Sequence, residues 1–96
     1  MHSKEYYQTL KESLEIDLLD VVEMILKIEL FLYDTDKVFK EFERLRLDEE
    51  PDYYVLKNIE KHQKKSLRHF LERLSNIELD IDHCSFMIKL INDREL

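Results

Sequence analysis

Histidine and acidic side chains in the second half of the chain are the first candidates for chemistry. His62, His69, Asn76 and His83 follow one another every seven residues. Zinc and di-iron sites in helical bundles use ligands one turn apart, whereas seven residues of helix separate two side chains by about 10 Å. Only Asp80 and His83 have the one-turn spacing, and that pair occurs once. The pattern therefore predicts histidines at the edge of a helix face, with no metal site and no cofactor.

No other residue pattern supports catalysis. The single cysteine, Cys84, cannot form an internal disulfide and is not paired with a positioned base, and the sequence contains no phosphate loop and no serine elbow. We therefore expect a protein that is not an enzyme. The first residues lack the apolar stretch of a secretory signal, so we expect an intracellular location, in the cytoplasm or the nucleus.

A basic stripe in the second half of the chain is the one feature that could bind phosphates. It consists of Lys57, Lys61, Lys64, Lys65, Arg68 and Arg73. Glu60 and Glu72 interrupt it at one-turn spacing, no aromatic residues are interleaved, and the whole chain has a net charge of −7. A solvated helix face is the simpler interpretation, and nucleic-acid binding through this stripe is the alternative function.

The elements that position these residues are predicted to be helices. The chain of 96 residues has no glycine and one proline, and tight hairpin turns between strands depend on glycine. The most apolar window, residues 14–33, holds 14 apolar residues in 20, but six charged residues are spread through it, which excludes a membrane span. We expect one soluble all-α domain covering residues 1–96.

Apolar residues at spacings of three and four define one buried face on each half of the chain. The spacing predicts a first arm over residues 3–47, a turn over 48–52 around Pro51, and a second arm over 53–93. We call the buried face of each arm its seam. The predicted seam of the first arm contains Leu14, Leu18, Val21, Ile25, Ile28, Leu32, Val38, Phe42 and Leu45. The predicted seam of the second arm contains Leu56, Ile59, Gln63, Leu67, Phe70, Leu74, Ile77, Ile81, Cys84, Ile88 and Ile91.

A long antiparallel helical hairpin is the simplest architecture for two such arms. Two helices share only one seam, so we expect the hairpin to complete a helical bundle by forming a dimer or by packing on a partner. The alternative is a monomeric bundle of three or four helices with breaks near residues 34–36, where Asp34, Thr35 and Asp36 are poor helix formers, and near residues 75–76, where Ser75 and Glu78 fit a capping box.

A second apolar stripe outside the seam carries the functional prediction. It lies roughly 140° around the helix from the seam of the first arm and recurs near the end of the second arm. The candidate interface residues are Ile16, Leu19, Leu26, Leu30, Tyr33, Leu79, Phe86 and Leu90. If residue i lies opposite roughly residue 99 − i, both parts of the stripe belong to one surface. Burial inside a larger bundle and contact with another chain explain the stripe equally well.

These observations together predict a small interaction module. We expect a regulatory or structural subunit that works by helix packing, as a homodimer or within a larger complex, and that binds protein and not membrane. The aromatic residues Tyr6, Tyr7, Phe39, Phe42, Tyr53 and Tyr54 gather near the first residues and around the predicted turn. Internal packing and contact with a partner both fit them.

Overall fold

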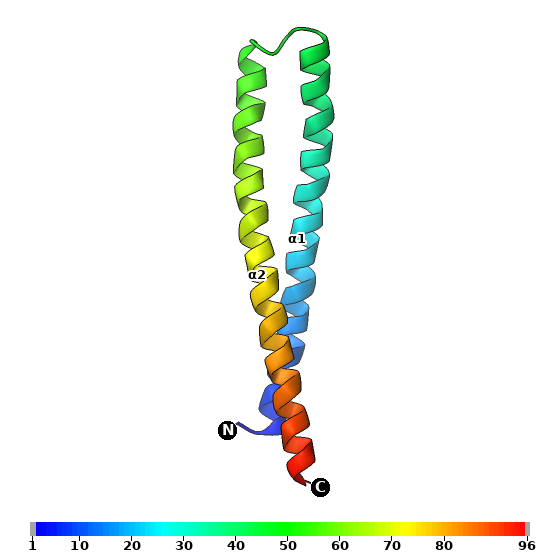
Figure 1. The fold of residues 1–96 in the computed structure, drawn as a ribbon, viewed down its shortest axis with the longest axis vertical. Helices are drawn as coiled ribbons and strands as arrows, with labels where there is room; N and C mark the ends of the chain where they lie inside the picture. Colours follow the sequence, from blue (N-terminus) through cyan, green and yellow to red (C-terminus); the bar gives the residue numbers. More distant parts are fainter. Residues whose placement is uncertain (1, 96) are drawn as a thin grey trace. The chain divides into compact units, whose positions relative to one another are not determined.

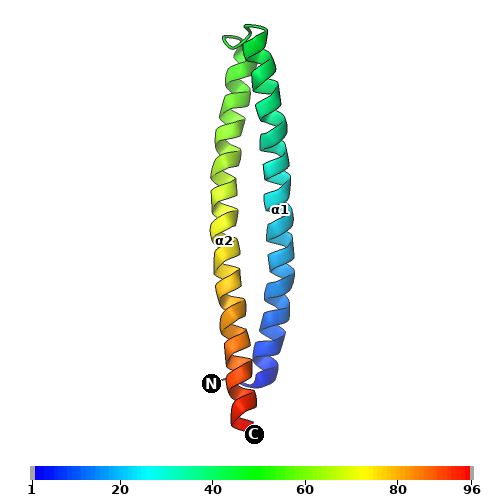
Figure 2. The ribbon, with the colours of Figure 1, turned by 45° about the vertical axis from the view of Figure 1, so that its right-hand side comes forward.

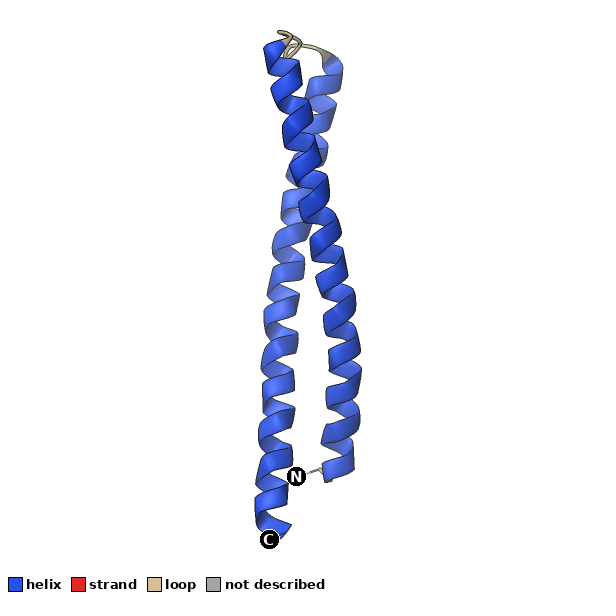
Figure 3. Cartoon of the chain, turned by 90° about the vertical axis from the view of Figure 1, so that its right-hand side faces the viewer, coloured by secondary structure: helices blue, strands red, loops and turns tan. Residues whose placement is uncertain are grey.

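The computed structural model describes residues 2–95, which form two long helices. Helix α1 is Lys4–Arg44 and helix α2 is Pro51–Glu95, with a short loop at residues 45–50 (Figure 1). The described residues are helix or loop throughout (Figure 3). The all-α hairpin prediction is confirmed. The alternative bundle is wrong, because helix continues through residues 34–36 and 75–76.

The chain divides into two compact units, and each helix contributes to both. Unit 1 is Met1–Val22 with Glu72–Leu96, and unit 2 is Glu23–Leu71. Within unit 2, the end of α1 and the start of α2 run antiparallel and are joined by the loop (Figures 1 and 2). Within unit 1, the first part of α1 runs antiparallel to the last part of α2, and the Tyr7 and His83 rings pack edge to face at 6.3 Å.

Local sequence explains where α1 begins. The backbone N–H of Tyr6 donates a hydrogen bond to the Ser3 hydroxyl oxygen at 3.2 Å, which makes Ser3 the N-cap residue. Glu5 places a carboxylate in the first turn, where it interacts favourably with the positive end of the helix dipole. Helix formation therefore starts at Lys4, close to the predicted start of the first arm.

The end of α1 is a Schellman motif built without glycine. The N–H of Leu47 donates to the carbonyl of Phe42 at 2.7 Å, and the N–H of Arg46 donates to the carbonyl of Glu43 at 3.1 Å. Arg46 has a φ of 56°, in the left-handed region that glycine usually fills at this position. The reversal therefore begins at Leu45, earlier than the predicted turn over 48–52.

Pro51 starts α2 instead of lying within the turn. Proline is well suited to the first position of a helix, because its φ is already helical and its missing N–H would have no partner there. Asp52 adds a carboxylate to the first turn. The prediction that Pro51 interrupts the helical pattern was correct, but the second helix includes this proline.

The core of each unit is a seam with alternating spacings of three and four. In unit 2 the most buried members on α1 are Ile25, Ile28, Thr35 and Phe39. In unit 1 they are Tyr7 and Val21 on α1 with Ile77 and Cys84 on α2. Such heptad spacing is typical of knobs-into-holes packing between two helices. No described buried side-chain nitrogen or oxygen lacks a hydrogen-bond partner.

Three residues assigned to the predicted seam lie outside it. Val38, Leu45 and Ile59 are 43%, 52% and 39% exposed. The prediction restarted the spacing after Asp36, but the helix does not break there, so the heptad continues through Thr35 and Phe39 to Phe42. On α2 the same spacing leads from Leu56 to Glu60, a half-buried residue, and leaves Ile59 beside the seam.

Aromatic contacts next to the loop fix the register of unit 2. The Tyr53 ring packs on Phe39 and Phe42, with centroids 5.4 and 5.9 Å away, and its hydroxyl donates to the Glu43 carboxylate at 3.4 Å. The residue numbers of two side chains that face each other in this unit therefore add up to about 95, whereas the predicted turn gave 99. The shift follows from the earlier end of α1.

Replacing Arg46 with glycine should stabilise the protein. A residue with a Cβ atom pays a steric energy cost in the left-handed region, and glycine does not. The greater conformational freedom of glycine in the unfolded chain offsets part of that gain. We expect the free energy of unfolding, measured by urea denaturation, to rise by about 0.5–1 kcal/mol. Arg68→Gly is the matched control, because Arg68 is exposed within α2, and it should lower stability by about 1 kcal/mol. A loss of stability in both variants would contradict the Schellman assignment.

Candidate interaction surfaces

The predicted second stripe lies on exposed faces of both helices. In unit 2 it comprises Leu26, Leu30 and Tyr33 on α1, and in unit 1 it comprises Ile16 and Leu19 on α1 with Leu79, Phe86 and Leu90 on α2. Seven of the eight side chains are between 59% and 69% exposed, and Leu90 is half-buried. The structure therefore leaves nearly all of this stripe uncovered by the chain itself.

The two parts of the stripe in unit 1 do not form one surface. Ile16 is two residues from the seam residue Leu18, and Leu79 is two residues from the buried Ile77, so each is about 200° around its helix from the seam. Each therefore faces away from the other helix. The prediction that the two parts of the stripe share one surface was wrong. It compared the positions of the residues along the two arms and did not compare the directions of their side chains around each helix axis.

The Leu26 stripe, defined as Leu26, Leu30 and Tyr33, is a continuous apolar face in unit 2. The three residues have spacings of four and three and are 59%, 62% and 61% exposed. At one end the Lys37 ammonium lies over the Tyr33 ring, 4.4 Å from its centroid, and at the other Lys27 and Glu23 form a salt bridge of 3.0 Å. An apolar face with charged ends suits packing against another helix.

A second row of exposed apolar residues was missed as a surface. The flank row consists of Met24, Phe31 and Val38 on α1 and Leu45 just beyond its end, which are spaced every seven residues and are 38–52% exposed. Val38 and Leu45 line a hollow of about 390 Å³ at the end of this row. The seven-residue spacing was visible in the sequence, but assigning two of these residues to the seam hid it.

The basic stripe is mostly exposed and partly engaged within the chain. The Lys57 ammonium lies over the Phe39 ring at 4.0 Å and over the Tyr53 ring at 5.5 Å. Lys64 lies 3.6 Å from the Glu60 carboxylate. Lys61, Lys65, Arg68 and Arg73 are exposed. Arg73 belongs to unit 1 and the other five to unit 2.

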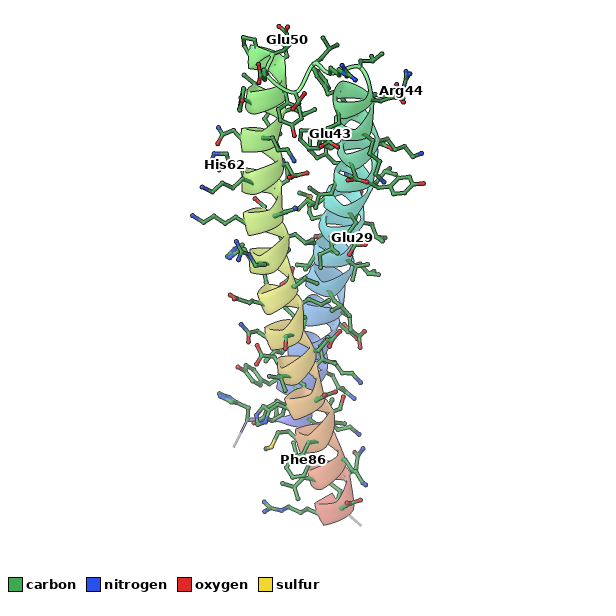
Figure 4. All side chains as sticks on the ribbon, turned by 45° about the horizontal axis from the view of Figure 1, so that its top comes forward. Glu29, Glu43, Arg44, Glu50, His62 and Phe86 are labelled. Carbon is green, nitrogen blue, oxygen red and sulfur yellow. The ribbon has the colours of Figure 1, made fainter. Side chains whose placement is uncertain are left out.

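The residues with catalytic or ligand chemistry are dispersed. His62 lies on the outer side of α2 (Figure 4), His69 is also exposed, and His83 packs on Tyr7 in unit 1. Within residues 2–95 no group of three or more histidine, cysteine or acidic side chains could hold a metal ion. Burial raises the pKa of the Cys84 thiol, Asp80 raises it further, and Lys11 opposes the shift.

The aromatic residues divide between packing and exposure. Tyr7 and Phe39 are buried, and Phe42 and Tyr53 are half-buried against their neighbours. Tyr6 stacks on His2 with centroids 3.9 Å apart and is 44% exposed, while Tyr54 is 60% exposed. Internal packing therefore explains four of these six residues.

Comparison with known proteins gives no relative from which a function could be inferred: no protein-family model, no curated protein and no solved structure matches this chain. In the part of the chain that the structure describes, neither helix has a stretch long and apolar enough to cross a membrane. The exposed faces of the two units are therefore the basis for any functional argument.

The buried thiol of Cys84 should react slowly in the folded protein. Cys84 is 1% exposed, so we expect it to react with a disulfide reagent such as DTNB about a hundredfold or more slowly than an exposed thiol, through opening of unit 1. The control is Cys84→Ser combined with Ser75→Cys, because Ser75 is exposed on α2 of the same unit. Equal rates would show that Cys84 is accessible.

The same thiol makes stability dependent on pH. Its pKa is higher in the folded chain than in the unfolded one, so the unfolded chain loses this proton first. Stability is therefore fully present below the ordinary thiol pKa and falls as the pH rises toward the folded value. Cys84→Ser should remove this decline in urea denaturation curves recorded over that range.

Proposed function

We propose that this protein is a small non-enzymatic interaction module, a regulatory or structural subunit that works by packing its exposed helix faces against another helical chain. The other chain is either a second copy, giving a homodimer, or a partner in a larger complex. The observation that carries the proposal is the Leu26 stripe, whose three large side chains are each about 60% exposed on one face of α1.

The energetic argument starts from what remains uncovered. Transfer of apolar surface from water stabilises an assembly by about 25 cal/mol per Å², so covering three large side chains contributes several kcal/mol before the cost of association. Contiguous apolar patches are uncommon on the surfaces of monomers. A four-helix bundle is the simplest assembly that covers an outer face of a helical hairpin.

The polar surroundings of the stripe also favour a helical partner. The pairs Glu23 with Lys27 and Asp36 with Lys40 are i,i+4 salt bridges of 3.0 Å with both side chains exposed. Such pairs contribute little stability individually, but they keep charged groups at the ends of the apolar face. These four charged side chains are therefore already paired with one another at the ends of the apolar face.

Replacing Leu26 and Leu30 together with glutamate tests the proposal. Two charges within a packed interface would cost several kcal/mol, because buried unpaired charge is strongly unfavourable. We expect the wild type to sediment as an assembly at low micromolar concentration, or to recover a partner from native cells, and the variant to stay helical and lose that association. Analytical ultracentrifugation with circular dichroism measures both properties.

Lys61→Glu with Lys64→Glu is the matched control in the same unit. Both side chains are exposed, so we expect each change to alter stability by about 0.5 kcal/mol and the mass to stay the same. If the Leu26 and Leu30 variant keeps the mass, the melting temperature and the partner of the wild type, the stripe is simply solvent-exposed and the proposed function is wrong.

A further inference from the structure

An apolar hollow lies at the end of the flank row in unit 2. It has a volume of about 390 Å³ and is lined by Lys37, Val38, Glu41, Phe42, Leu45 and Leu47. Its accessible wall is almost wholly apolar. Leu47 reaches this wall because its N–H is bonded to the Phe42 carbonyl, which turns the chain back over the last turn of α1. A hollow of this size fits one bulky aliphatic or aromatic side chain.

The surroundings of the hollow are acidic. Asp48, Glu49 and Glu50 follow Leu47 directly and are exposed, and Glu50 is labelled in Figure 4 where the loop meets α2. Between Phe31 and Asp52 there are eight acidic and four basic residues. None of the salt bridges within residues 2–95 involves Asp48, Glu49 or Glu50. These three carboxylates are therefore available to a basic partner.

Two basic groups near the hollow, Arg44 and Lys37, have partners within the chain, while Arg46, between Leu45 and Leu47, is exposed. The Arg44 guanidinium donates three hydrogen bonds to the Glu41 carboxylate, at 3.4 Å to one oxygen and at 3.1 and 2.7 Å to the other. Arg44 lies on the outer side of α1 (Figure 4). This contact holds the pKa of the Glu41 carboxyl below its usual value, so Glu41 stays ionised. Lys37 lies over the Tyr33 ring. The loop at residues 45–50 keeps an excess of negative charge, because it holds the three carboxylates of Asp48, Glu49 and Glu50 against the single guanidinium of Arg46.

The spacing of the flank row indicates the shape of an occupant. Phe31 and Val38 are seven residues apart on α1, Leu45 follows seven residues later just beyond its end, and each is partly exposed. An apolar row with that period matches the apolar stripe of a second helix lying along it, as in helix-in-groove recognition. An extended peptide would instead meet side chains at a period of two.

We propose that the hollow and the flank row bind a basic amphipathic helix of another protein. The helix inserts one bulky apolar side chain between Val38 and Leu47, and its lysine or arginine side chains approach Asp48, Glu49 and Glu50. This inference rests on the proposed function, because it specifies the partner as a basic helix, but it uses a different surface from the Leu26 stripe.

A helical peptide of leucine and lysine serves as the probe, titrated into the full chain by calorimetry and by amide NMR. We expect one peptide to bind per hollow, with chemical-shift changes confined to residues 31–50. The same peptide with glutamate in place of lysine should bind at least about tenfold more weakly, because it meets like charge. Higher salt should also weaken binding of the lysine peptide.

Two variants at the hollow separate the apolar and electrostatic contributions. Val38→Glu should weaken binding by about tenfold or more, because it places a charge in the apolar contact. Asp48→Lys with Glu49→Lys and Glu50→Lys should weaken it comparably without touching the wall of the hollow. Leu71→Glu is the control in the same unit, because Leu71 is 44% exposed and belongs to neither proposed surface, and it should leave the affinity within about twofold. Circular dichroism checks that each variant stays helical.

The outcomes distinguish this site from the Leu26 stripe. No binding of the lysine peptide, equal binding of the glutamate peptide, or shifts confined to unit 1 would overturn the inference. If Val38→Glu lowers the sedimentation mass while the wild type takes no peptide, a second copy occupies the hollow and the inference is also wrong. Loss of assembly in the variant with glutamate at positions 26 and 30 tests only the proposed function. Peptide binding at the hollow is measured separately and does not depend on that outcome.

Discussion

Burial of a single heptad-spaced seam on each helix is the constraint from which the rest of the structure follows. Only two positions in each heptad of either helix face the other helix. In unit 2 these positions bury Ile25, Ile28 and Phe39, while Leu26 and Leu30, on the same helix, stay about 60% exposed. A helix whose sequence is apolar on more than one side therefore cannot cover itself within a two-helix unit.

The reversal of the chain is the second determinant, because it sets the register and creates the hollow. Arg46 takes the left-handed position at the end of α1, and Pro51 starts α2 four residues after Leu47. Tyr53 then packs on Phe39 and Phe42. The same turn brings Leu47 back onto α1 and is followed by three acidic residues, so an apolar wall and an excess of negative charge arise side by side.

Unit 2 thus has two exposed apolar rows on the same helix with different surroundings. The Leu26 stripe ends at a salt bridge and at a lysine over an aromatic ring. The flank row ends at the hollow and its acidic loop. The first arrangement suits apolar packing of helices, and the second suits a partner chosen by its charge.

The sequence by itself determined the helical class, the main seam and the stripe at Leu26, Leu30 and Tyr33, because each depends on helical periodicity within one segment. It left open whether the arms break near residues 34–36 and 75–76, where the structure shows continuous helix. The tertiary structure decided what depends on contacts between segments. The early end of α1 shifted the register, Val38 and Ile59 moved out of the seam in favour of Thr35 and Glu60, and the folded loop created the hollow at Leu47. The direction of Ile16 and Leu79 follows from helical periodicity as well, but the prediction compared only their positions along the two arms. Periodicity specifies which residues share a face, but only packing against a second segment determines which face is covered.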